Sequence, residues 1–348
     1  MTSCLNAQAP AADPAPATEE KKDVPLSITG QVDAYFRGSS AKVGGLTSYT
    51  GANNGFSLGM ANIAFSKDLG KVSFVADMML GPRAEETNYN YKGGNSLAFL
   101  KQLYVSYKPS DKVKFTIGNF MTFVGYELVE ASNNLNYSMS YNYTNGPFFH
   151  TGLKAEFALS ENLTLMAGVF EPTDYKNGIF AAGGNLNIGG QLAYVNGGFK
   201  VYLNAITGKT PLSDTINFDN KATVLDLTAS YQVTPKFGLG VNVLNKGVTY
   251  LVNDKVSLAK AAFTGLAVYA NYAVSDNFIL AARGESFNDS KGVVFGVQPK
   301  IAAFTLSGNF KVDALTIIPE LRFDSADKAV FGAKKSATSY LLAAVYKF

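Results

Sequence analysis

Cysteine, histidine and tryptophan are scarce in this sequence. Its 348 residues include one cysteine, Cys4, one histidine, His150, and no tryptophan. A single cysteine excludes an intrachain disulfide and a cysteine-rich metal site. A single histidine excludes any metal site with two histidine ligands, and no nucleophile motif accompanies His150. We therefore predict no catalytic residue, no metal and no cofactor.

Charge and long apolar runs are also scarce. Charged residues make up 16% of the chain, against roughly 25% in an ordinary soluble domain. The net charge of +3 is too small to indicate a nucleic-acid partner. No uninterrupted apolar run reaches the roughly 18 residues that a membrane-spanning helix needs. The sequence therefore excludes helical membrane spans.

Apolar and aromatic residues are nevertheless abundant. The chain is 47% hydrophobic and 13% aromatic, yet its mean hydropathy is only +0.04. A transmembrane β-barrel predicts this combination, because lipid-facing and lumen-facing residues alternate along every strand and their hydropathies average out. A soluble all-β protein is the alternative at this stage.

The last eleven residues show the alternation most clearly. From Thr338 to the end, Tyr340, Leu342, Tyr346 and Phe348 share one parity, while smaller and polar residues mix on the other. This period of two indicates a strand. Aromatic residues suit the membrane interface, and the stretch resembles the C-terminal recognition strand of bacterial outer-membrane barrels. We predict that Tyr346 and Phe348 form an assembly signal for the barrel assembly machinery.

The N-terminal end lacks this pattern. Residues 1–9 are typical of the tail of a secretory signal, and residues 10–24 are rich in proline, alanine and charge without periodicity. We expect residues 1–25 to be a signal remnant and a disordered periplasmic tail.

Residues 26–348 predict one domain built from hairpins. Seven short polar turns alternate with eight long loops, which gives sixteen strands. The expected turns are 66–70, 109–112, 160–162, 195–198, 233–235, 274–277 and 312–314, and the expected loops are 38–55, 83–96, 121–149, 171–184, 207–222, 247–262, 288–299 and 324–337. The predicted fold is an all-β, transmembrane, antiparallel up-and-down β-barrel of the outer membrane. Its short turns and both termini face the periplasm, and its long loops face outside.

Three positions do not fit the pattern well. Lys101 shares the apolar parity of the strand from Leu97 to Tyr107. The stretch from Val293 to Gln298 fits a strand or a loop equally. Pro319 lies inside a predicted strand, where we expect a bulge or an end of pairing, because proline cannot donate a ladder hydrogen bond.

The inward-facing parity nominates the residues of a channel, since a barrel of sixteen strands is wide enough to leave an aqueous lumen. The predicted pore-lining charges are Asp33, Arg37, Asp77, Lys114, Lys154, Glu156, Lys200, Asp226, Arg283, Glu285, Glu320 and Arg322. Acidic and basic residues are equal in number, which argues against strong ion selectivity from the wall alone. Several are two residues apart on one face, and we favour wall pairing over a selective substrate ladder.

The loop at 121–149 is the longest and has few turn signals in its first half. It contains Tyr126, Glu127 and Glu130. Its aromatic residues gain by packing against the wall, so we expect the loop to fold inward and these three residues to line a constriction. A loop that only caps the barrel mouth is the alternative.

The same region resembles a known family. Gly125-Tyr126-Glu127, Asn136-Tyr137-Ser138 and the run from Asn145 to Lys154 are similar to the OmpL-like β-barrel porin-2 family, found widely in Bacteroidota. The resemblance implies an outer-membrane porin, in contact with outer-membrane lipid, that passes small hydrophilic solutes. It also places His150 at a loop-to-strand junction, which favours a structural role.

Three classes of function remain open at this stage: a porin, which we favour, a structural or adhesive surface barrel, and an enzyme on the barrel rim. A homo-oligomer is compatible with the barrel size, by resemblance to other porins.

Overall fold

The computed structural model describes residues 24–89, 96–176, 185–213, 218–252 and 256–348. The expected signal remnant lies outside the described residues. The strands are β1 (Ser27–Ser39), β2 (Gly55–Asp68), β3 (Val72–Leu80), β4 (Leu100–Ser110), β5 (Val113–Met121), β6 (Phe149–Ala158), β7 (Leu163–Phe170), β8 (Asn187–Asn196), β9 (Phe199–Ser213), β10 (Phe218–Thr234), β11 (Phe237–Val252), β12 (Val256–Ser275), β13 (Phe278–Asn288), β14 (Lys300–Val312), β15 (Leu315–Ala326) and β16 (Ser336–Lys347).

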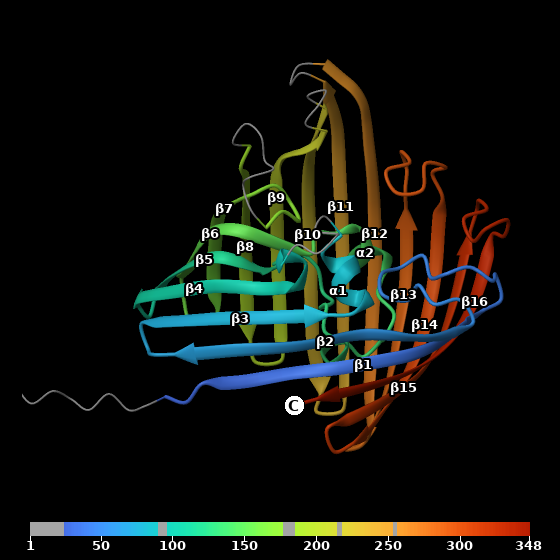
Figure 1. Ribbon diagram of the computed structural model, residues 1–348, viewed down its shortest axis with the longest axis horizontal. Helices are drawn as coiled ribbons and strands as arrows, with labels where there is room; N and C mark the ends of the chain where they lie inside the picture. The colour runs from blue at the N-terminus through green and yellow to red at the C-terminus, as the bar shows by residue number, and fades with distance from the viewer. Residues whose placement is uncertain (1–23, 90–95, 177–184, 214–217, 253–255) are drawn as a thin grey trace, which may run out of the picture.

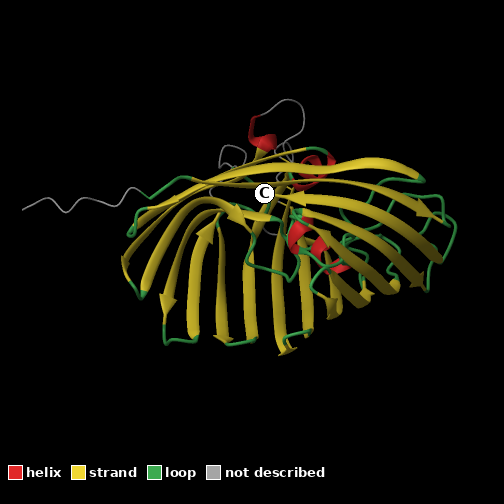
Figure 2. Cartoon of the chain, turned by 90° about the horizontal axis from the view of Figure 1, so that it is seen from below, coloured by secondary structure: helices red, strands yellow, loops and turns green. Residues whose placement is uncertain are grey.

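All sixteen strands join into one closed barrel in which each strand pairs antiparallel with its neighbours in sequence, and β1 closes on β16. Figure 1 shows β2 to β5 crossing in front of β9 to β12, and Figure 2 shows the strands as one curved wall. The predicted fold class and strand count are confirmed. The seven short turns also fall within or beside the predicted ranges.

The helical elements are short and lie in the connections. They are α1 (Pro82–Thr87), η1 (Ser96–Phe99), η2 (Ala131–Asn133) and α2 (Tyr141–Asn145). Over the described ranges, no helix is both long and apolar enough to span a membrane.

Alternation along β16 produces two different faces. Tyr340 and Leu342 are 52% and 53% exposed on the outer face, whereas Ala343 and Val345 are each 1% exposed inside. Residue Phe348 extends the pairing beyond β16, because its N–H donates to Gly30 O and its carbonyl accepts from Gly30 N, both at 3.0 Å. The outer face carries the apolar residues, as a lipid-facing wall requires.

Two expected long loops are mostly strand. The chain predicted to be loop at 207–222 continues β9 to Ser213 and begins β10 at Phe218, and the chain at 247–262 continues β11 to Val252 and begins β12 at Val256. Figure 1 shows β11 and β12 rising above the other strands. The described residues at the ends of these strands are mostly half-buried and no longer alternate clearly, while the backbone ladder continues. The prediction followed hydropathy and therefore placed the ends of these strands too early.

Lys101 faces inward, against its expected parity. The register of β3 with β4 shifts between Asp77 and Met78, so that Asp77 lies opposite Gln102 and Met78 lies opposite Leu100. Lys101 is the extra residue in this β-bulge, and a bulge re-aims the side chain it adds. The Lys101 side chain is 1% exposed and reaches Asp77 and Glu130.

Pro319 produces no bulge but does interrupt pairing. It stays opposite Leu342 of β16. On the other side, pairing of β15 with β14 stops after Glu320 and resumes at Ile317 in the same register. The missing N–H of proline explains the gap. The stretch from Val293 to Gln298 is a loop, held by Asp289, which accepts hydrogen bonds from the backbone.

Candidate functional site: the barrel interior

The chain between β5 and β6, residues 122–148, lies across the barrel interior, and we call it the inner segment. Gly125 N donates to Asp226 Oδ1 at 3.0 Å, and the Tyr137 hydroxyl donates to Asp33 Oδ2 at 2.5 Å. Asp226 lies in the middle of β10 and Asp33 in the middle of β1, far apart around the closed sheet. The inner segment must therefore pass inside the barrel wall.

Arg283 of β13 anchors the middle of the inner segment. Its guanidinium is 0% exposed, pairs with Glu127 at 2.6 Å and Glu285 at 2.8 Å, and donates to the carbonyls of Ser138 and Met139. A buried charge is tolerated only when it is paired and hydrogen-bonded. Glu127 is therefore part of a buried ion pair that joins the segment to the wall.

Arg322 and Glu285 extend this network. Arg322 Nη1 lies 3.0 Å from Glu285 Oε1, and its Nε donates to Asp324. Glu285 also accepts from Tyr141 N at 2.8 Å. Two wall arginines and their carboxylates thus form one continuous cluster beneath the segment.

Lys101 makes a second anchor. Its ammonium lies 2.5 Å from Asp77 Oδ2 and also pairs with Glu130 of the inner segment. The bulge that turns Lys101 inward therefore supplies the cation for Glu130. The two predicted constriction carboxylates, Glu127 and Glu130, are each held by a different wall cation.

Tyr126, the third predicted constriction residue, packs flat against the wall. Its ring stacks on Tyr269 with centroids 4.2 Å apart and planes at 18°. A Cβ added to Gly240 would lie 2.4 Å from the Tyr126 hydroxyl, so only glycine leaves room for this ring. A cavity of about 130 Å³ remains between the segment and β12 and β13 here, and Tyr126, Glu127 and Tyr269 are among its lining residues.

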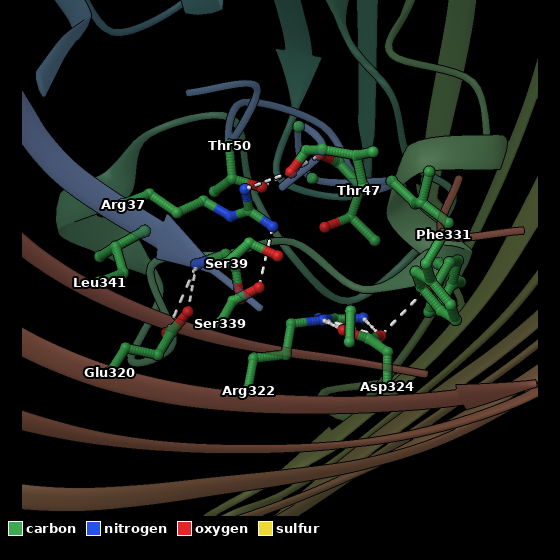
Figure 3. Close-up of a pocket in the computed structure, with 17 residues that line it drawn as sticks. Arg37, Ser39, Thr47, Thr50, Glu320, Arg322, Asp324, Phe331, Ser339 and Leu341 are labelled. Carbon is green, nitrogen blue, oxygen red and sulfur yellow. Dashed lines mark hydrogen bonds and ion pairs between the residues drawn. The ribbon is translucent and has the colours of Figure 1, made fainter. Parts of the chain in front are cut away.

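Arg37 of β1 and Glu320 of β15 lie near Arg322 and contact the loop after β1 and the inner segment (Figure 3). Arg37 donates to Ser339 Oγ and to Ala52 O, both at 2.8 Å. Glu320 accepts from the backbone N–H groups of Tyr137 and Ser138. The cavity beside them is only about 20 Å³, room for roughly one water molecule. These two residues hold loops in place.

The twelve predicted wall charges fall into two sets. The buried ones are Asp33, Arg37, Asp77, Asp226, Arg283, Glu285, Glu320 and Arg322. The side chains of Lys114, Lys154 and Glu156 are 42%, 19% and 27% exposed, and Lys200 is exposed. Glu156 pairs with both Lys114 and Lys154, at 3.1 Å and 3.2 Å. Of the wall charges two residues apart, Lys154 pairs with Glu156 and Arg283 pairs with Glu285, but Glu320 and Arg322 bind other partners. Most wall charges also contact the inner segment or a loop.

Arg83 of α1 is a site residue that sequence reasoning missed. It is buried, donates to Val129 O at 3.0 Å, and lies over the rings of Tyr49 and Tyr137 at 4.5 Å and 5.0 Å. No local pattern marks it, because it sits in a connection rather than on a strand. Lys101 was also missed, although its position on an apolar parity was a usable signal.

Comparison with known families decides the identity of this barrel. The family described as "Putative beta-barrel porin-2, OmpL-like" matches residues 25–348. The chain belongs to this family. The match covers the whole barrel, and it confirms the resemblance seen around the inner segment. No curated protein matches the chain by sequence.

Solved structures of outer-membrane channels share the fold of this OmpL-like porin. OmpT of Vibrio cholerae in its trimer form is 12% identical, with a TM-score of 0.60, over 93% of this chain and 99% of OmpT. The outer-membrane channel DcaP of Acinetobacter baumannii is 11% identical, with a TM-score of 0.58, over 95% of this chain and 99% of DcaP. At such identities these likenesses show the fold alone. Together with the family, they support an outer-membrane location.

His150 of this porin is enclosed by protein. It lies at the start of β6 and is 0% exposed. Its Nε2 is 2.9 Å from Thr122 Oγ1, and its ring packs beside Phe123 and Phe170 with centroids 4.9 Å and 5.3 Å away. These contacts give it a structural role. Within the described ranges, no three His, Cys, Asp or Glu side chains are grouped as a metal ion would require.

Asp174, in the loop after β7, gives this porin a testable pH dependence. Burial raises the pKa of its carboxyl from 3.8 to about 6, although the N–H groups of Phe148 and Phe149 donate to it. Between these two pH values the folded chain holds a proton that the unfolded chain has lost. The free energy of unfolding should therefore fall as pH rises through that window.

The variant Asp174→Asn stays neutral and should remove the contribution of Asp174 to this slope. The measurement is the thermal unfolding midpoint in detergent micelles between pH 4 and pH 6.5, roughly the window of the shift. That range ends below the pKa of Lys176, which burial lowers to about 7. Asp276→Asn removes an exposed carboxylate at a short turn and should leave the slope intact. Equal slopes for Asp174→Asn and the unaltered chain would contradict the assignment.

Proposed function

We propose that this barrel is a porin through which small hydrophilic solutes or ions diffuse passively. The observation that carries the proposal is the inner segment, which buried ion pairs hold across a closed sixteen-stranded wall. Such a wall encloses a wide lumen, and an ordered segment within it restricts what passes without closing the barrel. The family supports a channel rather than an adhesive barrel or an enzyme.

The inner segment acts as the constriction, with Tyr126, Glu127 and Glu130 at its narrow part. The alternative of a simple cap is less favourable, because the contacts with Asp33 and Asp226 lie at mid-strand rather than at the rim. The side of the segment that carries the exposed Leu128 and Asn133 borders the path for solutes.

The orientation and partners follow from the same architecture. The short turns and both termini face the periplasm, and the loop-bearing end faces outside. The outer face of the barrel contacts outer-membrane lipid. The barrel assembly machinery recognises the aromatic residues Tyr346 and Phe348 at the end of the chain. The trimer form of OmpT supports a homo-oligomer for this chain as well.

Reconstitution into planar lipid bilayers tests this function. We expect stable open-channel steps from the purified barrel. The variants Glu127→Gln and Glu130→Gln should each change conductance and ion selectivity, because each weakens an ion pair at the constriction. Unchanged values for both variants would rule out a constriction at these carboxylates, and a bilayer that stays closed would rule out the porin.

A further inference from the structure

Five inward-facing lysines lie on the half of the barrel wall that leads to the short turns. Lys114 and Lys154 lie on β5 and β6, Lys200 lies on β9, and Lys311 and Lys347 lie on β14 and β16. Each continues the inward parity of its strand, as Lys347 does after the buried Ala343 and Val345. We call these five residues the lysine ring.

Contacts of the ring support its inward orientation. Lys347 Nζ donates to Asn133 Oδ1 of the inner segment at 3.1 Å. Lys154 Nζ lies 4.7 Å from the centre of the Phe120 ring, which is itself buried. Lys311 lies opposite Thr316, two residues before the buried Ile318. The ammonium groups of the ring therefore border the interior at this end.

The ring carries an excess of positive charge. The one carboxylate among its partners is Glu156, which Lys114 and Lys154 share. Lys200 makes no ion pair with any residue in the part of the chain that the structure describes. The five ammonium groups thus have one carboxylate partner among them, and one further inward-facing carboxylate, Asp68 at the end of β2, lies at this end of the barrel.

Charges at or beside the short turns do not offset this excess. Their carboxylates are Asp68, Asp111, Glu161, Asp276 and Asp313, and their lysines are Lys67, Lys71, Lys108, Lys112 and Lys236, so the two signs are equal. The side chain of Asp111 is 99% exposed and pairs with Lys108 at 3.0 Å. Salt screens such fully exposed groups over about 10 Å at 0.1 M.

The buried carboxylates of the wall act in the opposite direction but lie away from water. Glu320 accepts from Ser307 and from two backbone N–H groups, and Asp226 accepts from Asn204, Asn242 and Gly125. Their side chains are covered by the inner segment. A permeating ion meets the lysine ring directly, and the groups nearest to an ion dominate its energy.

We propose that the lysine ring makes this channel prefer small anions, such as carboxylates and phosphates, over cations. The proposal rests on the porin function and adds a class of solute to it. It also revises the balance of charge expected from the sequence, because burial removes most wall carboxylates from the lumen surface and leaves the lysines there.

Reversal potentials in a gradient of potassium chloride test the preference. The unaltered channel should favour chloride over potassium. The triple variant Lys114→Gln, Lys200→Gln, Lys311→Gln removes three exposed ring charges and should lower the chloride-to-potassium permeability ratio several-fold. The preference should weaken at 1 M salt, where the screening length is only about 3 Å.

The matched control removes the same charge from the turns, as Lys71→Gln, Lys112→Gln, Lys236→Gln, and should change the ratio much less. The variant Glu156→Gln should raise it. A channel that conducts but favours potassium, or a ring variant no different from the turn control, would overturn the anion preference and leave the porin standing. The absence of any conductance would instead overturn the porin itself.

Discussion

Replacing Arg283 with methionine should raise the single-channel conductance several-fold and destabilise the barrel. The guanidinium holds Glu127 and the carbonyls of Ser138 and Met139 against β13. Methionine fills much of the same volume but donates no hydrogen bond. Breaking a buried pair from one side leaves an uncompensated charge and costs about 3 to 5 kcal/mol.

The conductance effect follows from how the inner segment is held. Without Arg283, the buried carboxylates Glu127 and Glu285 repel each other, and the middle of the segment loses its main contact with the wall. Among the contacts that remain are those of Lys101 with Glu130, of Arg322 with Met139 O, and of Glu320 with the N–H groups of Tyr137 and Ser138. We expect the segment to move out of the lumen and the channel to widen.

A matched substitution separates this effect from general loss of charge. Lys154→Met removes a cation from the partly exposed wall, where it pairs with Glu156 rather than with the segment. It should leave the constriction intact. The double variant Glu127→Gln, Arg283→Met removes the carboxylate that loses its cation, while Glu285 keeps Arg322, and should recover part of the stability. An Arg283→Met channel with unaltered conductance would show that the segment is held without this cluster.

Deleting Phe348 should sharply reduce the amount of folded barrel in the outer membrane. The backbone of Phe348 makes two hydrogen bonds to Gly30, and these bonds close the seam between the first and last strands. The Phe348 ring is 52% exposed on the outer face, where an aromatic residue suits the membrane interface. The deletion therefore removes both a closing contact and the proposed assembly signal.

Substitution at the same position tells these two contributions apart. Phe348→Ala keeps the backbone bonds to Gly30 and removes the ring, whereas Phe348→Tyr keeps an aromatic ring. If recognition depends on the ring, the alanine variant should resemble the deletion and the tyrosine variant should assemble normally. The fraction of folded barrel in isolated outer membranes provides the measurement.

The channels that do form without Phe348 should conduct normally, because the deletion leaves the ion pairs of Glu127 with Arg283 and of Glu130 with Lys101 in place. Normal folding and insertion of the deletion variant would count against a role for Phe348 in assembly.

The fold of this barrel was predictable because its signals are local. Lipid outside and water inside impose a period of two on each strand, and polar turn residues mark each hairpin, so the strand count and the two faces can be read from short windows. The two faces of β16 can be predicted from such a short window, and the resemblance around Tyr126 and Glu127 is equally local. Prediction failed where the local signal stopped, as in the extended hairpins of β9 to β12.

The site depended on contacts between residues far apart in sequence. The sequence alone identified sixteen strands, a likeness to a porin family and a set of inward-facing charged residues in which acidic and basic residues are equal in number. Only the tertiary structure decided which of those charges meet water, because the inner segment buries Arg283 and Glu320 and leaves Lys114 and Lys200 exposed. Whether a charge is buried depends on which residues cover it. The residues that cover Arg283 and Glu320 are more than 80 positions away from them in the chain.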